Sequence, residues 1–262
     1  NYDVSIDQIK KTCYLLVNAQ SSMASIFNLS NDLLFEIDEN KNLDLKELIA
    51  RYCKDFLDEL KKSDEKISKN FLEIIKDSSQ IITHSYSSTV LNALLYAKKS
   101  GKRFSVVCTE SRPKNEGVKL AKKLGENGIE VKLIVDSAVF SFIKDSDLLI
   151  VGGDAVTDLG LVNKIGTKGI AITAKGNDVP VYALCSSMKF LTGNILKKES
   201  EKNPSEITKY ELANVKPVNY YFEKTPLKYF NKIITEKKIL DSSKVKDIVK
   251  NLKVHEDLKK LI

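Results

Sequence analysis

From residue 79 onward the sequence alternates short apolar runs with amphipathic segments, and this pattern constrains the fold more than any other feature. The connections between these segments are short and polar. Such alternation is typical of a parallel sheet covered by helices on both faces. We therefore predict a Rossmann-like α/β domain. Its expected strands are 80–83, 104–108, 130–135, 148–151 and 179–184, and its expected helices are 90–99, 117–125, 139–143 and 169–175.

Residues 1–78 carry a helical pattern without any strand pattern. Apolar side chains recur at helical spacing in residues 6–16, and clearer helices are expected over 43–61 and 68–76. We predict a small α-helical N-terminal domain, residues 1–78, which packs, dimerises or binds a partner. The α/β domain then occupies residues 79–262 and ends in an amphipathic C-terminal helix.

Composition argues against several classes of protein. The sequence has no apolar run of about 18 residues and no recognisable signal peptide, so we expect a cytoplasmic protein without a membrane span. The four cysteines form no CxxC pair and there are two histidines, which disfavours a metal site. Neither a dinucleotide fingerprint nor a P-loop string occurs, and we expect no cofactor.

The formal net charge of +7 raises the question of nucleic-acid binding. However, the lysines alternate with acidic residues along helical segments, as on solvated helix faces, and the chain has three arginines. No groove-reading motif is present, so we predict no direct sequence-specific binding to nucleic acid.

Polar clusters follow four of the expected strands. They lie at 84–89, 109–112, 136–137 and 152–164. Each has an ordinary structural interpretation, such as helix capping by Ser or Thr, but the carboxyl ends of parallel strands meet at one edge, where open α/β sheets bind ligands. A hydroxyl-rich turn into a helix suits a phosphate, and an acid, an amide and an ammonium at Asp154, Asn163 and Lys164 suit a phosphorylated polyol. Gly152 and Gly153 are expected to leave room for that ligand beside the main chain.

The same strings resemble a known family. ITHSYSSTVLNAL, FSVVCTESRP, DLLIVGGDAV, VNKIGTKGIAITAK and VPVYALCSSMKF are similar to the regulatory alpha, beta and delta subunits of translation initiation factor 2B. The superfamily also contains methylthioribose-1-phosphate isomerase and ribose-1,5-bisphosphate isomerase. The resemblance covers roughly residues 80–240, and NKIGT and THSYS are its most specific parts.

The resemblance implies particular site residues. The isomerases use a cysteine and an aspartate as an acid–base pair. The aspartate corresponds to Asp154, whereas the cysteine position is Ser85, whose hydroxyl is a far weaker acid than a thiol, with its pKa of about 8.5. The remaining ligand contacts implied by the resemblance or by their place after a strand are Ser87, Ser88, Thr89, Arg112, Asn163, Lys164 and Lys189.

Two further positions depart from the isomerases. The segment Asn18–Ala24 lacks their phosphate-holding Arg-Gly-Ala string, and Glu116 stands where the methylthioribose enzyme has glutamine. Because serine at position 85 is also typical of the initiation-factor alpha subunits, we favour a non-catalytic regulatory subunit that acts in translation initiation. Such a subunit would form a homodimer or a larger homo-oligomer and bind a sugar or nucleotide phosphate. The resemblance implies the alpha subunit of initiation factor 2 as its partner.

The main alternative is an aldose–ketose isomerase resembling ribose-1,5-bisphosphate isomerase, with Asp154 as its catalytic residue. A metabolite-binding protein without a role in translation stays open as a third interpretation.

Overall fold

A seven-stranded sheet forms the centre of the protein. The computed structural model describes residues 5–19, 23–195 and 199–259. The sheet has the strand order β10-β9-β7-β4-β1-β2-β3, and its strands are parallel except for β10, which pairs antiparallel with β9. Its strands are β1 (Ser79–His84), β2 (Phe104–Thr109), β3 (Glu130–Ile134), β4 (Leu148–Val151), β7 (Val181–Leu184), β9 (Lys232–Ile234) and β10 (Ile239–Leu240). The predicted α/β fold is confirmed.

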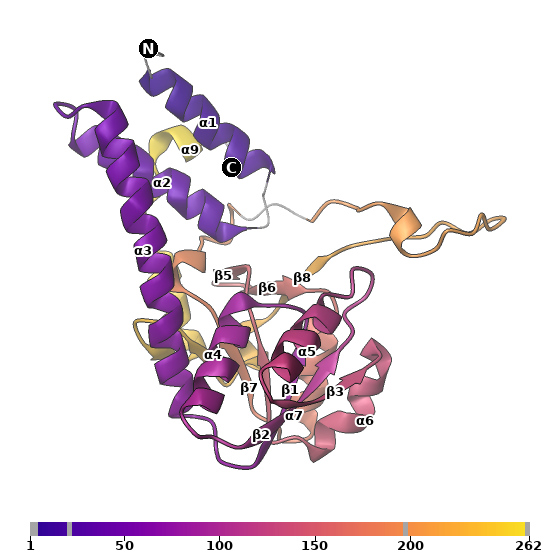
Figure 1. Cartoon of the computed structure of the whole chain (residues 1–262). Coiled ribbons are helices and arrows are strands. Elements are labelled where there is room, and N and C mark those ends of the chain that lie inside the picture. Colours follow the sequence, from indigo (N-terminus) through magenta and orange to yellow (C-terminus); the bar gives the residue numbers. More distant parts are fainter. Residues whose placement is uncertain (1–4, 20–22, 196–198, 260–262) are drawn as a thin grey trace.

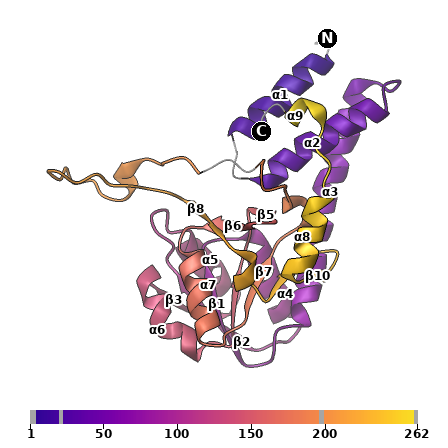
Figure 2. The same ribbon diagram turned by 180° about the vertical axis from the view of Figure 1, so that it is seen from behind.

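Helices cover both faces of this sheet (Figures 1 and 2). Two apolar cores result, one on each face, and neighbouring residues of one strand enter different cores. Ile81 belongs to the core beneath α4 and α5, whereas Ile82 belongs to the core with α7 and α8, because successive strand side chains point to opposite faces. The covering helices are α4 (Ser88–Lys99), α5 (Glu116–Glu126), α6 (Val139–Phe142), α7 (Thr167–Gly176) and α8 (Ser242–Lys250).

The order of the strands reverses between β1 and β4. From β1 the chain builds β2 and β3 on one side, and then returns to place β4 on the other side. In the register of this pair His84 lies opposite Val151. The residues that follow, Ser85 and Gly152, therefore begin the loops at the topological switch point, where such sheets bind ligands.

A second, three-stranded antiparallel sheet was absent from the sequence-based prediction. It contains β5 (Ala155–Thr157), β6 (Gly160–Lys164) and β8 (Phe222–Thr225). All residues of β5 and β6 are buried, so neither strand shows the alternation that reveals a strand in the sequence. This sheet carries Asn163 and Lys164 on β6, next to the switch point.

The N-terminal region is helical, as predicted, with α1 (Ile6–Ala19), α2 (Ala24–Glu39) and α3 (Leu45–Leu72). The two helices expected over 43–61 and 68–76 are one continuous helix, since the polar segment between them contains good helix formers and neither Gly nor Pro. Asp44 caps α3 by accepting hydrogen bonds from the N–H groups of Lys46 and Glu47.

A third apolar core joins this helical region to the small sheet. It contains Phe27 and Leu34 of α2 together with Ala155 of β5 and Val162 of β6, and Leu258 of the short C-terminal helix α9 (Glu256–Lys259) closes it. Figure 1 shows α1 and α2 standing over β5 and β6, and α3 running alongside α4. The proposed division of the chain at residue 78 stays a prediction.

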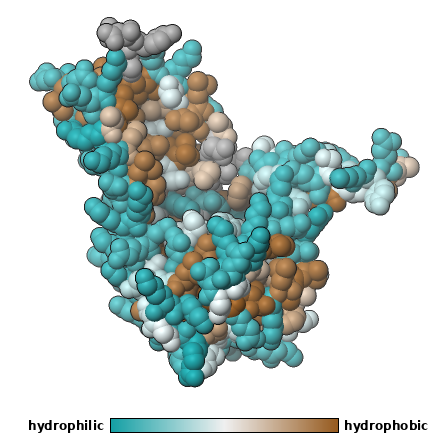
Figure 3. Space-filling view, viewed as in Figure 1, coloured by the Kyte–Doolittle hydropathy of each residue, from teal (hydrophilic) through white to brown (hydrophobic). Residues whose placement is uncertain are grey.

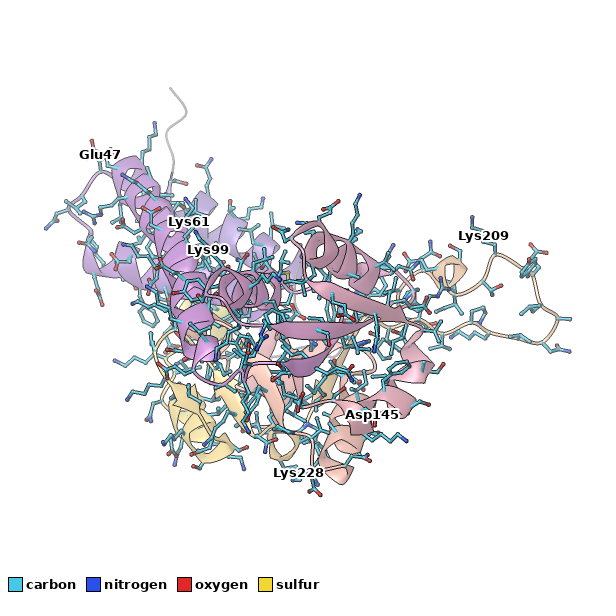
Figure 4. All side chains as sticks on the ribbon, turned by 60° about the horizontal axis from the view of Figure 1, so that its bottom comes forward. Glu47, Lys61, Lys99, Asp145, Lys209 and Lys228 are labelled. Carbon is cyan, nitrogen blue, oxygen red and sulfur yellow. The ribbon has the colours of Figure 1, made fainter. Side chains whose placement is uncertain are left out.

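Residues 199–221, which we call the arm, leave the body of the protein before returning as β8 (Figures 1 and 2). Figure 4 shows Lys209 on the arm and Glu47 near the start of α3 at opposite sides of the molecule. Figure 3 shows apolar residues gathered over the N-terminal helices and a mainly hydrophilic arm. Within the described ranges, the helices are all too short or too polar to cross a membrane.

Candidate functional site

A chain of hydrogen bonds links the ends of β1 and β2, and we call it the floor of the site. His84 Nδ1 lies 2.6 Å from the Thr109 hydroxyl, and that hydroxyl lies 3.1 Å from the hydroxyl of Ser111. Ser111 Oγ in turn accepts the Ser85 backbone N–H at 2.8 Å. Ser85 and Ser111 have φ angles of 69° and 64°, so left-handed residues turn the chain after both strands.

The contacts of His84 define its protonation. The Ile165 carbonyl oxygen, 2.8 Å from Nε2, can only accept, so Nε2 carries the hydrogen and Nδ1 accepts from Thr109. Burial lowers the pKa of this histidine below its ordinary value of 6.5, although Asp136, 4.0 Å away, acts in the opposite direction. The floor is therefore a neutral network at pH 7.

The glycines after β4 leave less space than expected. A Cβ at Gly152 would lie 2.6 Å from Ser87, and one at Gly153 would lie 3.1 Å from Leu161. The expectation that these glycines leave room for a ligand is wrong, because the protein's own side chains fill the space. Their role is to let the loops after β1 and β4 approach closely.

Asp154 is half-buried just beyond these glycines. Burial raises the pKa of its carboxyl group; Lys189 opposes the rise and Glu199 of the arm adds to it. The Lys189 ammonium donates to the Gly153 carbonyl at 2.6 Å. The start of α2 is also attached here, since the Ala24 N–H donates to the Asp154 carbonyl at 3.1 Å. Of the segment Asn18–Ala24, in which arginine is missing, residues 20–22 lie outside the described residues.

The hydroxyl-rich turn at the start of α4 divides its side chains between two directions. Ser87 caps the helix by accepting from the Val90 N–H at 3.3 Å, and Ser88 is exposed. Thr89 instead donates its hydroxyl to Asp64 of α3 at 3.0 Å. Because its hydroxyl group is hydrogen-bonded to α3, Thr89 could contact a phosphate through its backbone N–H group.

Lys164 and Asn163 both have partners within the protein. The Lys164 ammonium is held by both carboxylate oxygens of Glu116, at 2.9 and 3.0 Å, and its side chain is 2% exposed. Asn163 donates its amide to the Thr167 hydroxyl at 3.1 Å, at the start of α7. Both residues lie at the expected edge, and contact with a ligand stays a proposal for each.

The arm forms a charged roof beside this lysine. Three lysine ammonium groups make cation–π contacts with the Tyr221 ring: those of Lys114, Lys164 and Lys202 lie 5.7, 5.3 and 5.6 Å from its centroid. Its hydroxyl bonds to Glu206, which also pairs with Lys114 and whose pKa is lowered to about 2, chiefly by the Lys114 bond. Sequence reasoning missed this cluster, because about a hundred residues separate its two sides and neither carries a motif.

Two side chains near the end of β2 have partners within the protein. Arg112 is exposed and donates to the carbonyl oxygens of Glu206 and Ile207, at 3.2 and 3.4 Å, so it tethers the arm. Asp136 caps no helix; it accepts the backbone N–H groups of Ser111 and Arg112, both at 2.7 Å. Both side chains therefore shape the loop after β2, and contact of Arg112 with a ligand stays a prediction.

A buried thiol lies near Asp154 but does not replace the cysteine missing at position 85. Cys185 is fully buried, with its Cβ 3.5 Å from the position of a Cβ on Gly153, and burial raises its pKa to about 12. Such a thiol stays protonated at neutral pH. In the described ranges, no three His, Cys, Asp or Glu side chains gather in a way that could hold a metal ion.

Residues 3–242 match the initiation factor 2 subunit family. Ribose 1,5-bisphosphate isomerase of Methanocaldococcus jannaschii is 36% identical over 237 residues, which cover 88% of this chain and 76% of that protein. A putative translation initiation factor eIF-2B subunit 2-like protein of Pyrococcus furiosus is 36% identical over 222 residues, which cover 84% of this chain and 76% of that protein. Both functional names considered from the sequence thus occur among the relatives.

The fold is also found in solved structures. The translation initiation factor eIF-2B of Pyrococcus horikoshii superposes with a TM-score of 0.77 at 32% identity, covering 89% of this chain and 82% of that one. A 5-methylthioribose 1-phosphate isomerase from the same organism has a TM-score of 0.70 at 22% identity, covering 88% and 68%, and shares the fold.

Proposed function

The chain belongs to the initiation factor 2 subunit family, and from this premise we propose that it is a sugar-phosphate aldose–ketose isomerase. One observation carries the proposal: a half-buried carboxyl group with a raised pKa, Asp154, lies at the switch point beside the loop of Ser85. Curated relatives with the isomerase name, from Methanocaldococcus jannaschii and Archaeoglobus fulgidus, support it at 36% and 35% identity.

Asp154 is assigned the proton transfer. An aldose–ketose isomerase takes a proton from one carbon and returns it to the neighbouring carbon, so its base must also serve as an acid. A carboxyl group performs both steps best when its pKa moves toward the working pH, as burial achieves here. The Ser85 hydroxyl hydrogen-bonds a substrate oxygen, and the start of α4 holds a phosphate through backbone N–H groups.

The test is turnover of ribose phosphates, with ribose 1,5-bisphosphate and ribose 5-phosphate as substrates. Asp154→Asn should lower kcat by about 10²–10⁴-fold, the usual contribution of a positioned acid–base group. Asp158→Asn makes the same change four residues further on, at an exposed side chain, and should leave kcat unchanged. Ser85→Cys should raise kcat, since a thiol is the stronger acid. Absence of turnover in the wild type and in Ser85→Cys would contradict the isomerase proposal.

A second candidate function is a non-catalytic regulatory subunit of translation initiation, which the serine at position 85 favours. In that case a sugar or nucleotide phosphate should raise the melting temperature without being converted, because it binds the folded state alone. Lys189→Ala should remove the shift. This candidate also predicts a cytoplasmic protein that captures the alpha subunit of initiation factor 2, and such capture would favour it over the isomerase. It further predicts that light scattering finds this chain as a homodimer or a larger homo-oligomer.

A further inference from the structure

One edge of the large sheet lies open. β3 is the last strand in the sheet order and, among the described residues, pairs only with β2. The inner strands β1, β2, β4 and β7 are mostly buried, whereas Glu130, Lys132 and Leu133 of β3 are exposed. The strand at the other edge, β10, has two residues, and edge strands this short offer little to pair with. β3, with five residues, is therefore the longer open edge.

This edge carries free backbone groups and apolar side chains. Ile134 faces β2, where its carbonyl oxygen accepts the Glu110 N–H at 2.8 Å. Because alternate residues of the strand face opposite edges, the backbone N–H and C=O groups of Val131 and Leu133 face away from β2. Leu133 is 48% exposed, and Val135, just after the strand, is 53% exposed. Strands of parallel sheets are ordinarily buried, so this edge has the character of a surface that another polypeptide covers.

The two charged residues of β3 decide what can pair there. A lysine on an edge strand normally prevents pairing with another chain. Here Glu130 and Lys132 lie on one face of the strand, and neither side chain has an ion-pair partner in the described ranges. In an antiparallel pair of two copies centred on Val131, Glu130 of each copy lies opposite Lys132 of the other. The same register places Val131 opposite its own counterpart and Leu133 opposite Ile129, on the other face.

The neighbouring antiparallel registers lack this complementarity. A pair centred on Lys132 sets the two lysines directly opposite each other, and a pair centred on Leu133 sets Glu130 opposite Asp136. Opposite charges across a strand pair are stabilising, whereas like charges directly opposite are destabilising. The strand is thus complementary to a second copy of itself in the register centred on Val131.

The helices beside β3 enlarge this surface. A stable interface buries about 800 Å² on each partner, which is more than one short strand supplies. α5 and α6 cover opposite faces of the sheet, and Val118 of α5 and Phe140 of α6 are 39% and 52% exposed. Figure 3 shows exposed apolar residues where Figure 1 places α6. Apolar side chains are therefore available on both sides of the open edge.

We propose that β3 pairs antiparallel with β3 of a second copy of this chain, about a two-fold axis at Val131. The pairing joins two seven-stranded sheets into one continuous sheet. It forms four cross-strand contacts between charged residues of opposite sign only if each Glu130 and each Lys132 is counted from both copies, that is, two Glu130–Lys132 pairs in all. The interface lies one strand away from the floor of the site, because β2 carries Thr109.

Charge reversal tests this register. Sedimentation equilibrium should find the wild type, with a chain mass of 29.4 kDa, in an assembly with an even number of chains. Glu130→Lys and Lys132→Glu each turn two attractive pairs into two repulsive ones and should weaken the pairing by roughly tenfold or more. An equimolar mixture of the two variants should restore it, since each supplies the charge that the other lacks. Lys61→Glu makes the same reversal at an exposed position of α3 and should change nothing.

Three results would overturn the inference. They are a wild type that stays monomeric, single reversals that leave the dissociation constant unchanged, and a mixture that assembles no better than its components. Both substituted side chains are exposed, and the melting temperature of each variant shows whether it folds.

A cysteine pair tests the register without any change of charge. Cys53 is exposed and the other three cysteines are buried, so Cys53→Ser gives a suitable background. Val131→Cys should form a disulfide with its own counterpart under mild oxidation, because residues directly opposite lie within disulfide range. Leu133→Cys should not, since four residues separate it from its counterpart along the strand. A disulfide through Leu133→Cys alone would refute the proposed register.

Discussion

The floor and the roof of the site are built in opposite ways. The floor, from His84 through Thr109 and Ser111 to Ser85, is buried and neutral, and its hydrogen bonds connect the ends of the adjacent strands β1 and β2. The roof, where Tyr221 meets Lys114 and Glu206, is partly exposed and held by ion pairs. Screening by salt weakens exposed ion pairs and leaves buried hydrogen bonds nearly unchanged. The floor therefore supplies fixed geometry, whereas the roof supplies charge that responds to solution conditions.

The largest effect is expected where the floor meets α5. Gly117→Ala would place a Cβ against the Thr109 carbonyl and should destabilise the protein by more than about 3 kcal/mol, lowering the melting temperature by about 10 °C. Gly125→Ala, on the same helix with open space around it, should stabilise by up to about 1 kcal/mol. Calorimetry of the two variants checks this; equal melting temperatures would show that the contact between helix and floor is not rigid.

A smaller effect should appear in the pH dependence of stability. Burial lowers the pKa of His84 below 6.5, so as the pH falls below 6.5 this histidine becomes protonated in the unfolded state before it does in the folded state. The contribution of His84 to the free energy of unfolding is therefore complete above pH 6.5. It is lost as the pH falls toward the pKa of His84 in the folded state, by about 1.4 kcal/mol per pH unit at most. Urea unfolding at pH 7.5 and 5.5 should show a steeper loss for the wild type than for His84→Gln. Parallel losses would mean that His84 is protonated in the folded protein.

The smallest effect is expected in the roof. Tyr221→Phe keeps the ring beside Lys164 but removes the hydroxyl that bonds to Glu206. Limited proteolysis should cut the arm a few times faster, because local opening of exposed segments costs little. The melting temperature should stay unchanged, since the floor and the cores are untouched. A lower melting temperature would show that the arm stabilises the whole fold, and that the roof, like the floor, contributes to global stability.

The same contrast explains what could be predicted from the sequence. The parallel sheet and the clustering of His84, Ser85 and Asp154 at one edge follow from strand periodicity and from the rule for strand ends. By contrast, the partner of Lys164 lies 48 positions away and that of Lys114 lies on the arm. Such pairs leave no periodic signal.

Gly152 shows the limit of residue types as a guide. Glycine indicated space beside the main chain, but the structure decides what fills that space, and here it is Ser87. The failure to predict strands β5 and β6 has a related cause, since full burial removes the alternation of apolar and polar residues by which a strand is recognised.

The third apolar core has a consequence for how the protein can be divided. Its residues come from α1 and α2, from the small sheet that carries Lys164, and from α9 near the C-terminal end. A fragment beginning at residue 79 would expose Ala155 and Val162 to water, on the same sheet that presents Asn163 and Lys164. Helices α1 and α2 therefore protect the protein against aggregation, because they cover apolar residues of a sheet that would otherwise be exposed to other molecules.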